Sequence, residues 1–433
     1  METKLLRIAE ISRSKPKEVF TSLYHLINKE MLIECHKELD GSKAVGVDEI
    51  SKQEYNENLE EHLNILVVKL KNKEFIPMPA KRVNIPKANG KTRPLGIAVY
   101  EDKIVQLALK KIVEAIFEPK FLDCMYGFRP NRRCHGAIKE LTANIEKRKV
   151  SYIVDADIAG YFDNVDHEWL MKCIEQHIKD PNILKLIRRF LKAGIVENGE
   201  YKETNAGTPQ GSILSPILAN IYMHYVIVLW FEKVIKRDFT GESYITVYAD
   251  DYVCCFQYRN EAELFFNKLL PERLQKFNLQ LAKDKTRLIE FGRFAQERRN
   301  GKKPETFDFL GFTFYCGKNR NGKFNVKKKT SRKKYTSKIK EFKVWCKQNR
   351  HMETRILMKK VNEKLEGHYR YFGIEDNYKM LKNYKHEIKR ILYKWLNRRS
   401  EKISYTWESF RKMIEQHYHL KEPKIYVNIR GSI

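Results

Sequence analysis

Two adjacent acidic residues interrupt an otherwise apolar stretch of the chain. Asp250 and Asp251 stand in the middle of YITVYADDYVCCF, residues 244–256. The β-branched and aromatic residues on both sides predict two strands joined by a tight turn that carries the acids. Aspartate is common in solvated turns, but adjacent carboxylates repel each other, and holding them together requires a nearby cation or a raised pKa. The pair is therefore either an exposed hairpin tip or part of a site with a partner elsewhere.

The stretch DADIAGYFD offers that partner. Asp157 stands where a strand predicted for residues 151–157 runs out. Three carboxylates from two neighbouring strand ends would form an oxygen site suited to Mg²⁺, and two such ions stabilise the attacking and leaving oxygens of a phosphoryl transfer. The sequence thus predicts a metal site at Asp157, Asp250 and Asp251. Asp155 and Asp163 compete for the same role, but one has the position of a strand residue and the other that of a helix start.

The elements around these acids mix helices and strands irregularly. Residues 1–75 have apolar residues at helical spacing, and residues 75–97 predict a hairpin with an Asn89–Gly90 turn. A helix is expected over residues 101–118, and residues 207–235 predict a Gly/Pro turn followed by a long apolar helix. Because the strands do not alternate regularly with helices, we expect an α+β fold rather than a doubly wound sheet.

The charge of the chain is concentrated in its last third. The 433 residues carry 83 Lys and Arg against 55 Asp and Glu, and residues 281–433 alone hold 41 basic and 16 acidic residues. Residues 318–360 contain 17 basic residues and only two acidic ones, and aromatic residues are interspersed among the cations that follow. Such a surface favours a polyanionic partner, nucleic acid above all, although Lys-rich helices are also common as plain solvated faces.

The cysteines and the apolar runs indicate the compartment. None of the eight cysteines forms a C-x-x-C pair, so we expect buried free thiols rather than structural zinc or a disulfide framework. The N-terminal segment has no apolar core typical of a signal peptide, and the run YVIVLWF is too short to span a bilayer. We therefore expect a cytoplasmic protein without a membrane partner.

Several motifs in order resemble those of reverse transcriptases. DADIAGYF, GTPQGSILSPILANIY, YADD, KT and FLGF follow one another, together with IPKANGKTRPLGI and YGFRPNRRCHGAI. LEGHYRYFGI and RRSEKISYTWESFRKMIEQ resemble the region that follows in group II intron-encoded reverse transcriptases and maturases and in their domesticated bacterial relatives. The residues up to Ile433 include no Cys/His cluster of an HNH endonuclease, so we expect the endonuclease-lacking type.

The resemblance implies a right-hand polymerase of α+β class. Its parts would be a helical N-terminal extension over residues 1–75, the fingers and palm of the reverse transcriptase fold over residues 76–317, and a basic helical thumb or maturase (X) domain over residues 318–433. Asp157, Asp250 and Asp251 match the catalytic aspartates that bind two Mg²⁺ ions. Five further positions match residues around the incoming nucleotide: Lys87 and Arg93 hold the triphosphate, Phe162 is the aromatic gate against a ribose 2′-hydroxyl, and Gln210 and Gly211 lie beside the nucleotide and template-primer.

The implied function is RNA-directed DNA synthesis. The partners would be an RNA template with a DNA or RNA primer, deoxynucleoside triphosphates and structured group II intron RNA, whose splicing and mobility the protein would assist. The implied location is the bacterial cytoplasm, at the nucleoid when the protein is bound to DNA. Two alternatives remain open: a non-enzymatic RNA-binding splicing cofactor, and a domesticated enzyme serving repair, phage defence or CRISPR adaptation.

Overall fold

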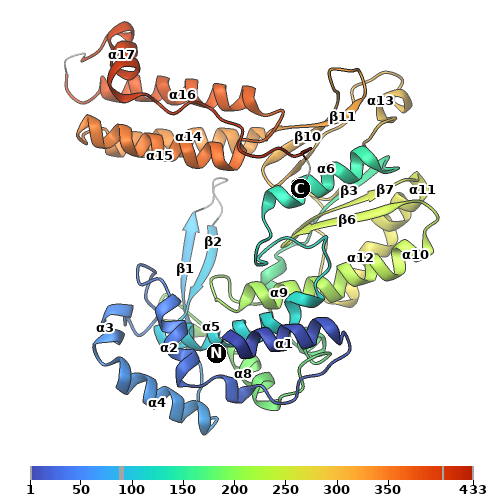
Figure 1. The fold of residues 1–433 in the computed structure, drawn as a ribbon, viewed down its shortest axis with the longest axis vertical. Helices are drawn as coiled ribbons and strands as arrows, with labels where there is room; N and C mark the ends of the chain where they lie inside the picture. Colours follow the sequence, from blue (N-terminus) through green and yellow to red (C-terminus); the bar gives the residue numbers. More distant parts are fainter. Residues whose placement is uncertain (1, 87–91, 402–403, 432–433) are drawn as a thin grey trace. The chain divides into compact units, whose positions relative to one another are not determined.

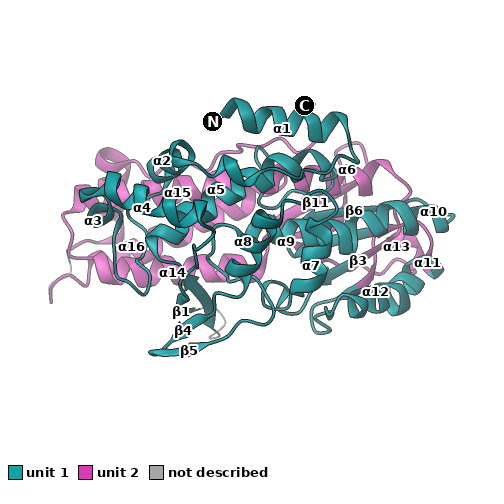
Figure 2. Cartoon of the chain, turned by 90° about the horizontal axis from the view of Figure 1, so that it is seen from below, with its two compact units in different colours: residues 1–133, 154–254, 260–287 teal, residues 134–153, 255–259, 288–433 magenta. Residues whose placement is uncertain are grey.

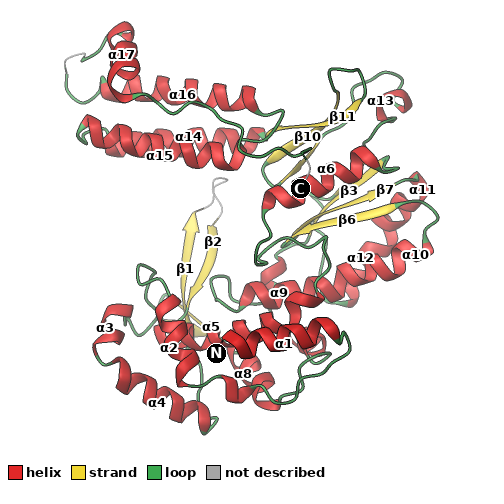
Figure 3. Cartoon of the chain, viewed as in Figure 1, coloured by secondary structure: helices red, strands yellow, loops and turns green. Residues whose placement is uncertain are grey.

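The chain forms two compact units. The computed structural model describes residues 2–86, 92–401 and 404–431. The first unit comprises residues 1–133, 154–254 and 260–287, and the second comprises residues 134–153, 255–259 and 288–433 (Figure 2). Both mix helix and strand, as expected for an α+β protein (Figure 3). The division predicted at residues 75 and 317 stays a prediction, because these units are built from discontinuous segments.

The N-terminal part of the first unit is helical and leads into a hairpin. Its helices are α1 (Glu2–Ser14), α2 (Lys29–Glu38), α3 (Lys52–Glu57) and α4 (Leu59–Lys71), followed after the hairpin by α5 (Tyr100–Phe117). The hairpin strands β1 (Ala80–Pro86) and β2 (Thr92–Ile97) pair antiparallel, with Val83 opposite Leu95. Two short strands, β4 (Ile195–Glu197) and β5 (Glu200–Lys202), extend this sheet in the order β2-β1-β4-β5. The predicted hairpin is confirmed, while its Asn89–Gly90 turn and Lys87 lie outside the described residues.

A second sheet carries the acidic residues. Its strands are β3 (Tyr152–Asp157), β6 (Ser243–Tyr248), β7 (Asp251–Phe256) and β8 (Arg287–Glu290), in the order β6-β7-β3-β8. Figure 1 labels β3, β6 and β7 of this sheet. The strand residues are mostly buried, as the apolar sequence predicts. The helices of the chain between β3 and β8 are α7 (His167–Ile174), α8 (Pro181–Leu191), α9 (Ser215–Met223), α10 (Lys236–Asp238), α11 (Arg259–Leu264) and α12 (Leu270–Lys276).

One long helical stretch bears on the expectation that no segment of the chain spans a membrane. Helical turns run from Ser215 to Asp238, and this stretch of 24 residues, with a mean hydropathy of 1.3, is long and apolar enough to cross a membrane by length and composition alone. Within its apolar segment of 18 residues, 67% is buried inside the protein, as in a core helix. The long apolar helix predicted within residues 207–235 is confirmed, and YVIVLWF is only a part of it, because polar residues such as Asn220 and His224, both buried, interrupt the apolar letters.

The second unit combines a small sheet with long helices. Strands β9 (Phe307–Phe309), β10 (Phe312–Lys318) and β11 (Phe324–Thr330) pair in the order β11-β10-β9. The helices are α6 (Cys134–Lys147), α13 (Ala295–Arg298), α14 (Arg332–Asn349), α15 (Thr354–Phe372), α16 (Tyr378–Leu396) and α17 (Trp407–Met413). Helix α16 packs against both α14 and α15 (Figure 1). The basic region is thus mostly helical, as expected, but it begins with a strand, β11.

The cysteines have the state that the sequence predicts. All eight are free thiols, and only Cys134 and Cys316 are not fully buried. Burial raises the pKa of the Cys35 and Cys346 thiols to about 12. These groups are therefore protonated and unreactive at neutral pH.

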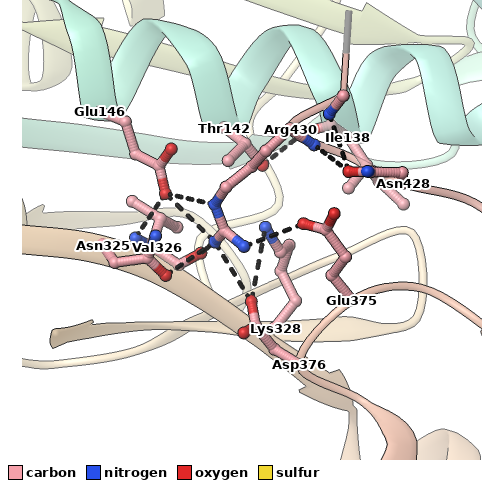
Figure 4. Close-up of polar contacts among 11 residues, drawn as sticks. Ile138, Thr142, Glu146, Asn325, Val326, Lys328, Glu375, Asp376, Asn428 and Arg430 are labelled. Carbon is pink, nitrogen blue, oxygen red and sulfur yellow. Dashed lines mark hydrogen bonds and ion pairs between the residues drawn. The ribbon is translucent and has the colours of Figure 1, made fainter. Parts of the chain in front are cut away.

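Arg430 ties the last described residues to the body of the second unit (Figure 4). Its guanidinium donates to the carboxylates of Glu146, Glu375 and Asp376 at 3.0–3.2 Å, and to the side-chain oxygen of Asn325 and the carbonyl oxygen of Val326 at 2.7 Å. These acceptors come from α6, from β11 and from the loop between α15 and α16. A single side chain therefore joins three separate segments.

We expect Arg430→Ala to lower the free energy of unfolding of the second unit by about 2 kcal/mol, because it leaves partly buried carboxylates without their cation. Burial and the charge of Arg430 lower the pKa of the neighbouring, fully buried Lys328 ammonium to about 8. Removal of the Arg430 charge therefore relieves some repulsion at Lys328, which offsets a small part of the loss. Urea unfolding followed by hydrogen exchange of α6 and β11 measures the loss. Arg390→Ala, at an exposed site with one ion pair to Glu387, should cost at most about 0.5 kcal/mol; equal losses for the two variants would contradict the assigned role.

Candidate active site

A hairpin turn of the first unit presents the two adjacent acids. Strand β6 ends at Tyr248 and β7 begins at Asp251, so that Ala249 and Asp250 form the turn between them. Ala249 has a left-handed backbone (φ 57°), and the backbone of Gly127 packs so closely on it that a Cβ at residue 127 would lie 2.2 Å from the Ala249 nitrogen. The predicted strand-turn-strand is confirmed, and close backbone packing fixes the position of the turn.

The third acid lies near this turn. Asp157 is the last residue of β3, and β3 is the neighbour of β7 in the sheet. Burial, followed by the charge of Asp157, raises the pKa of Asp250, while Arg93 and Lys285 lower it. Withdrawal from water, followed by the charges of Asp250, Asp157 and Asp155, raises the pKa of Asp251 to about 6. The carboxylates therefore lie close enough to repel one another, although Asp251 remains exposed to solvent.

Two basic residues before and within β8 balance this negative charge. The Lys285 ammonium forms an ion pair with Asp157, and this hydrogen bond, followed by the charges of Asp157, Asp251 and Asp250, raises the pKa of Lys285. Arg287 pairs with Asp155 at 3.5 Å between Nη2 and Oδ2. The sequence interpretation quoted the KT dipeptide but gave Lys285 no role. A lysine two residues before a strand was the available signal, and only the fold brings it to the acids.

The carboxylates have the right chemistry for magnesium. Three carboxylates supply the hard oxygen ligands that Mg²⁺ takes, and a divalent cation would relieve the repulsion that raises the pKa of Asp250 and Asp251. Across the described residues, however, no three His, Cys, Asp or Glu side chains are arranged to hold a metal ion. Asp157 is instead turned to Lys285. The assignment of two Mg²⁺ ions to these residues stays a prediction.

Arg93 and Gln210 form a polar chain at the start of β2. The Arg93 Nε donates to the Gln210 side-chain oxygen at 2.8 Å, and the Gln210 amide donates to both carboxylate oxygens of Asp163 at 3.2 and 3.3 Å. The positive charge of Arg93 also lowers the pKa of Asp250. The structure thus brings two of the predicted nucleotide-binding residues together beside the acids, and it gives Asp163 a partner other than a metal.

Gly211 is required by its surroundings. Its backbone is left-handed (φ 110°), and a Cβ there would lie 2.6 Å from the carbonyl oxygen of Gly96 in β2. The Gly96 nitrogen in turn donates to the Gln210 carbonyl at 2.6 Å. Only glycine fits such a close approach of two backbones, so the turn that carries Gln210 is held directly against the hairpin.

Phe162 lines a cleft beside this turn. It is half-buried, and its ring lies edge-on to Phe128 with 6.1 Å between ring centroids. The cleft wall continues through Pro94, Thr208 and Gln210, and the Thr208 nitrogen donates to the Phe162 carbonyl at 2.7 Å. Phe128, exposed and in a left-handed conformation, was not singled out in the sequence. Its motif YGFRPN was visible, but the contact with Phe162 exists only in the fold.

A family model described as reverse transcriptase (RNA-dependent DNA polymerase) matches residues 85–314, more than half of the chain. The chain belongs to the reverse transcriptase family. The match contains every predicted site residue that the structure places around the turn of β6 and β7, together with the cleft at Phe162. The reverse transcriptase region therefore coincides with the cluster of acids and its counter-cations.

Three relatives of known name indicate which branch of the reverse transcriptase family the chain resembles. The group II intron-encoded protein LtrA of Lactococcus lactis subsp. cremoris is 41% identical over 244 residues, 56% of this chain and 40% of LtrA. Protein YkfC of Escherichia coli (strain K12) is 37% identical over 187 residues, 42% of this chain and 49% of YkfC. Nuclear intron maturase 1, mitochondrial, of Arabidopsis thaliana is 31% identical over 94 residues, 22% of this chain and 13% of the maturase. The chain thus matches less than half the length of each, and it is a member of the group II intron reverse transcriptase and maturase family.

Proposed function

We propose that this chain is an RNA-directed DNA polymerase that extends a primer 3′-hydroxyl with deoxynucleotides. The observation that carries the proposal is the group of three carboxylates at the ends of β3 and β7, with Arg93 and Lys285 acting on their charge. In a reverse transcriptase, acids that raise one another's pKa are expected where a metal-assisted phosphoryl transfer takes place. Release of pyrophosphate would complete each addition.

Different residues of the site would bind the metal ions, contact the triphosphate and balance the charge. Asp157, Asp250 and Asp251 would hold two Mg²⁺ ions, which supply charge stabilisation for the attacking and leaving oxygens. The Arg93 guanidinium, held by Gln210, would contact the triphosphate with its remaining donors. Lys285 would release Asp157 and keep the surrounding charge balanced. Most of the rate would then come from positioning and electrostatics, as in phosphoryl transfers generally.

Primer extension tests the proposal directly. The full chain is incubated with a DNA primer annealed to an RNA template, the four deoxynucleotides and Mg²⁺, and the products are separated by length. We expect extension to the template end, and none when Mg²⁺ is chelated. Failure to extend any primer under conditions in which the protein binds the primer-template would contradict the polymerase function and favour a role in RNA binding alone.

Phe162 gives a prediction about sugar specificity. If its ring blocks the space of a ribose 2′-hydroxyl, Phe162→Val should lower the preference for deoxynucleotides over ribonucleotides by about tenfold or more, the equivalent of at least about 1.4 kcal/mol. The kcat/KM ratio for a deoxynucleotide and the matching ribonucleotide measures this. Phe128→Val removes the ring that contacts Phe162 but keeps the Phe162 ring itself, so it serves as the control for the loss of an aromatic ring at this cleft. A preference unchanged in Phe162→Val would assign Phe162 to the core.

A second function, support of intron splicing, is favoured by the basic second unit. Residues 281–433, most of which belong to this unit, carry a surplus of 25 positive charges, and a maturase is among the relatives. We propose that this part binds structured intron RNA, in which case the affinity should fall steeply with salt. Splicing of an intron RNA that the wild type stimulates should continue with a polymerase-dead Asp250→Asn protein; loss of both activities would show that they are not separable.

A further inference from the structure

A cavity of about 460 Å³ lies among helices α14, α15 and α16 of the second unit. This volume is within the range of small-molecule sites. Its wall is formed largely by aromatic rings, among them Phe342 and Trp345 of α14 and Tyr371 and Tyr384 of α15 and α16. Trp345 is half-buried and Tyr371 is exposed, with one face of the Tyr371 ring stacked on Phe312, so each ring is still partly open to the cavity or to solvent. Such surfaces favour a planar, aromatic group.

A glycine, Gly367, forms part of the cavity wall. Gly367 lies in the middle of α15 and lines the cavity. Glycine is disfavoured inside helices by about 1 kcal/mol relative to alanine, and here its backbone does not require it, since no left-handed φ occurs at this position. A Cβ at residue 367 would also have no other atom within 4 Å. Gly367 is exposed, and a larger side chain at this position would extend into the open space at the cavity.

Positive charge surrounds the aromatic wall. The Lys364 ammonium lies 4.6 Å from the centre of the Trp345 ring, and among the described residues Lys334 has no ion-pair partner. Lys338 is different, because it pairs with Glu341 at 2.8 Å. Three ammonium groups and one carboxylate, that of Glu341, thus line a cavity with aromatic walls, and the net positive charge suits a ligand with a flat ring and an anionic group.

His368 adds unused hydrogen-bonding capacity at the same wall. Its ring stacks on Tyr384 with 3.6 Å between centroids and an interplanar angle of 8°. The residue is 8% exposed, and neither ring nitrogen has a hydrogen-bond partner within the described residues. Buried polar groups are rarely left in this state. A neutral imidazole offers one donor and one acceptor, and the edge of a nucleobase carries both.

We propose that this cavity binds a single unpaired nucleotide, with its base against the rings of Trp345 and Tyr371 and its phosphate at Lys334 and Lys364. A nucleotide extruded from structured RNA is the source that suits the basic second unit, so the inference rests on the proposed RNA binding; a free nucleotide has the same chemistry. Stacking of bases on aromatic side chains with Lys at the phosphate is a recurrent mode of RNA recognition.

The test uses two RNA hairpins and one free nucleotide. One hairpin carries a single bulged 2-aminopurine, the other is fully paired with 2-aminopurine in the stem, and AMP is the free nucleotide. We expect the full chain to bind the bulged hairpin at least tenfold more tightly and to quench its fluorescence. Gly367→Leu, which fills the cavity, should abolish the preference and the quenching, and Gly367→Ala should reduce both. Displacement of the bulged base by AMP would identify a free nucleotide as a ligand too.

A charge-matched pair of variants covers the case in which Gly367→Leu does not fold. Lys334→Gln should lower the affinity for the bulged hairpin severalfold, whereas Lys359→Gln, an exposed lysine elsewhere on α15, should affect both hairpins equally. Equal binding of the two hairpins without quenching would overturn the nucleotide site and leave RNA binding intact. Binding of neither hairpin would overturn the proposed RNA binding itself, and the site would then stand only if AMP binds in a Gly367-dependent way.

Discussion

Replacing Asp250 with asparagine is expected to lower the rate of primer extension by about 10²–10³-fold or more, with the fold and the affinity for primer-template retained. Asparagine has the shape of aspartate without its charge, so the turn between β6 and β7 is kept while an oxygen ligand is weakened. Burial and Asp157 raise the pKa of Asp250, which means that its ionised form costs energy in the fold. The variant should therefore be as stable as the wild type or more stable.

Single-turnover extension and thermal unfolding, measured on the same preparation, separate these effects. Asp238→Asn is the matched control: Asp238 ends helix α10 in the same unit, is exposed, and pairs with Arg237. It should extend primers at the wild-type rate. Asp250→Asn with wild-type activity would rule out the assigned role of this carboxylate, and a lower melting temperature would attribute the lost activity to the fold.

The local pattern of the sequence was sufficient to predict the strands and the turn that carry the acids. Strand-forming residues on both sides of Asp250 and Asp251 predict a hairpin, and those before Asp157 predict a strand that ends at it. The hairpin of β1 and β2 and the long helix from Ser215 follow from the same alternation and periodicity. Such features depend on neighbours within about ten residues, which a sequence displays directly.

Contacts between residues far apart in the sequence could not be predicted from this local pattern. The ion pair of Lys285 with Asp157 joins residues 128 positions apart, and Arg430 reaches Glu146 across 284 positions. A lysine or arginine in a basic region looks like any other until the fold selects its partner. Strand β11 was missed because its Lys327, Lys328 and Lys329 resemble the solvated helices that follow, yet Lys328 is fully buried. Burial of a charge is decided by tertiary structure alone.

Buried His368 should make the second unit sensitive to acid. Burial, followed by the charge of Lys338, lowers the pKa of His368 to about 3, whereas a histidine in the unfolded chain has a pKa of about 6.5. Below pH 6.5 the unfolded chain therefore binds a proton that the folded unit does not accept until about pH 3. The stability is full above pH 6.5 and is lost as the pH falls; at pH 4 the loss from this one residue is about 3 kcal/mol.

His368→Phe isolates this contribution. Phenylalanine keeps a ring stacked on Tyr384 and removes both unpaired nitrogens, so the variant should be at least as stable as the wild type at pH 7.5, and its advantage should grow by about 3 kcal/mol at pH 4. Urea unfolding monitored by hydrogen exchange of α15 measures the difference at both pH values. His386→Phe, at an exposed position of α16, should show no such growth. A constant difference between His368→Phe and wild type would mean that the folded unit protonates this imidazole as readily as the unfolded chain does, so that water or a partner reaches its nitrogens.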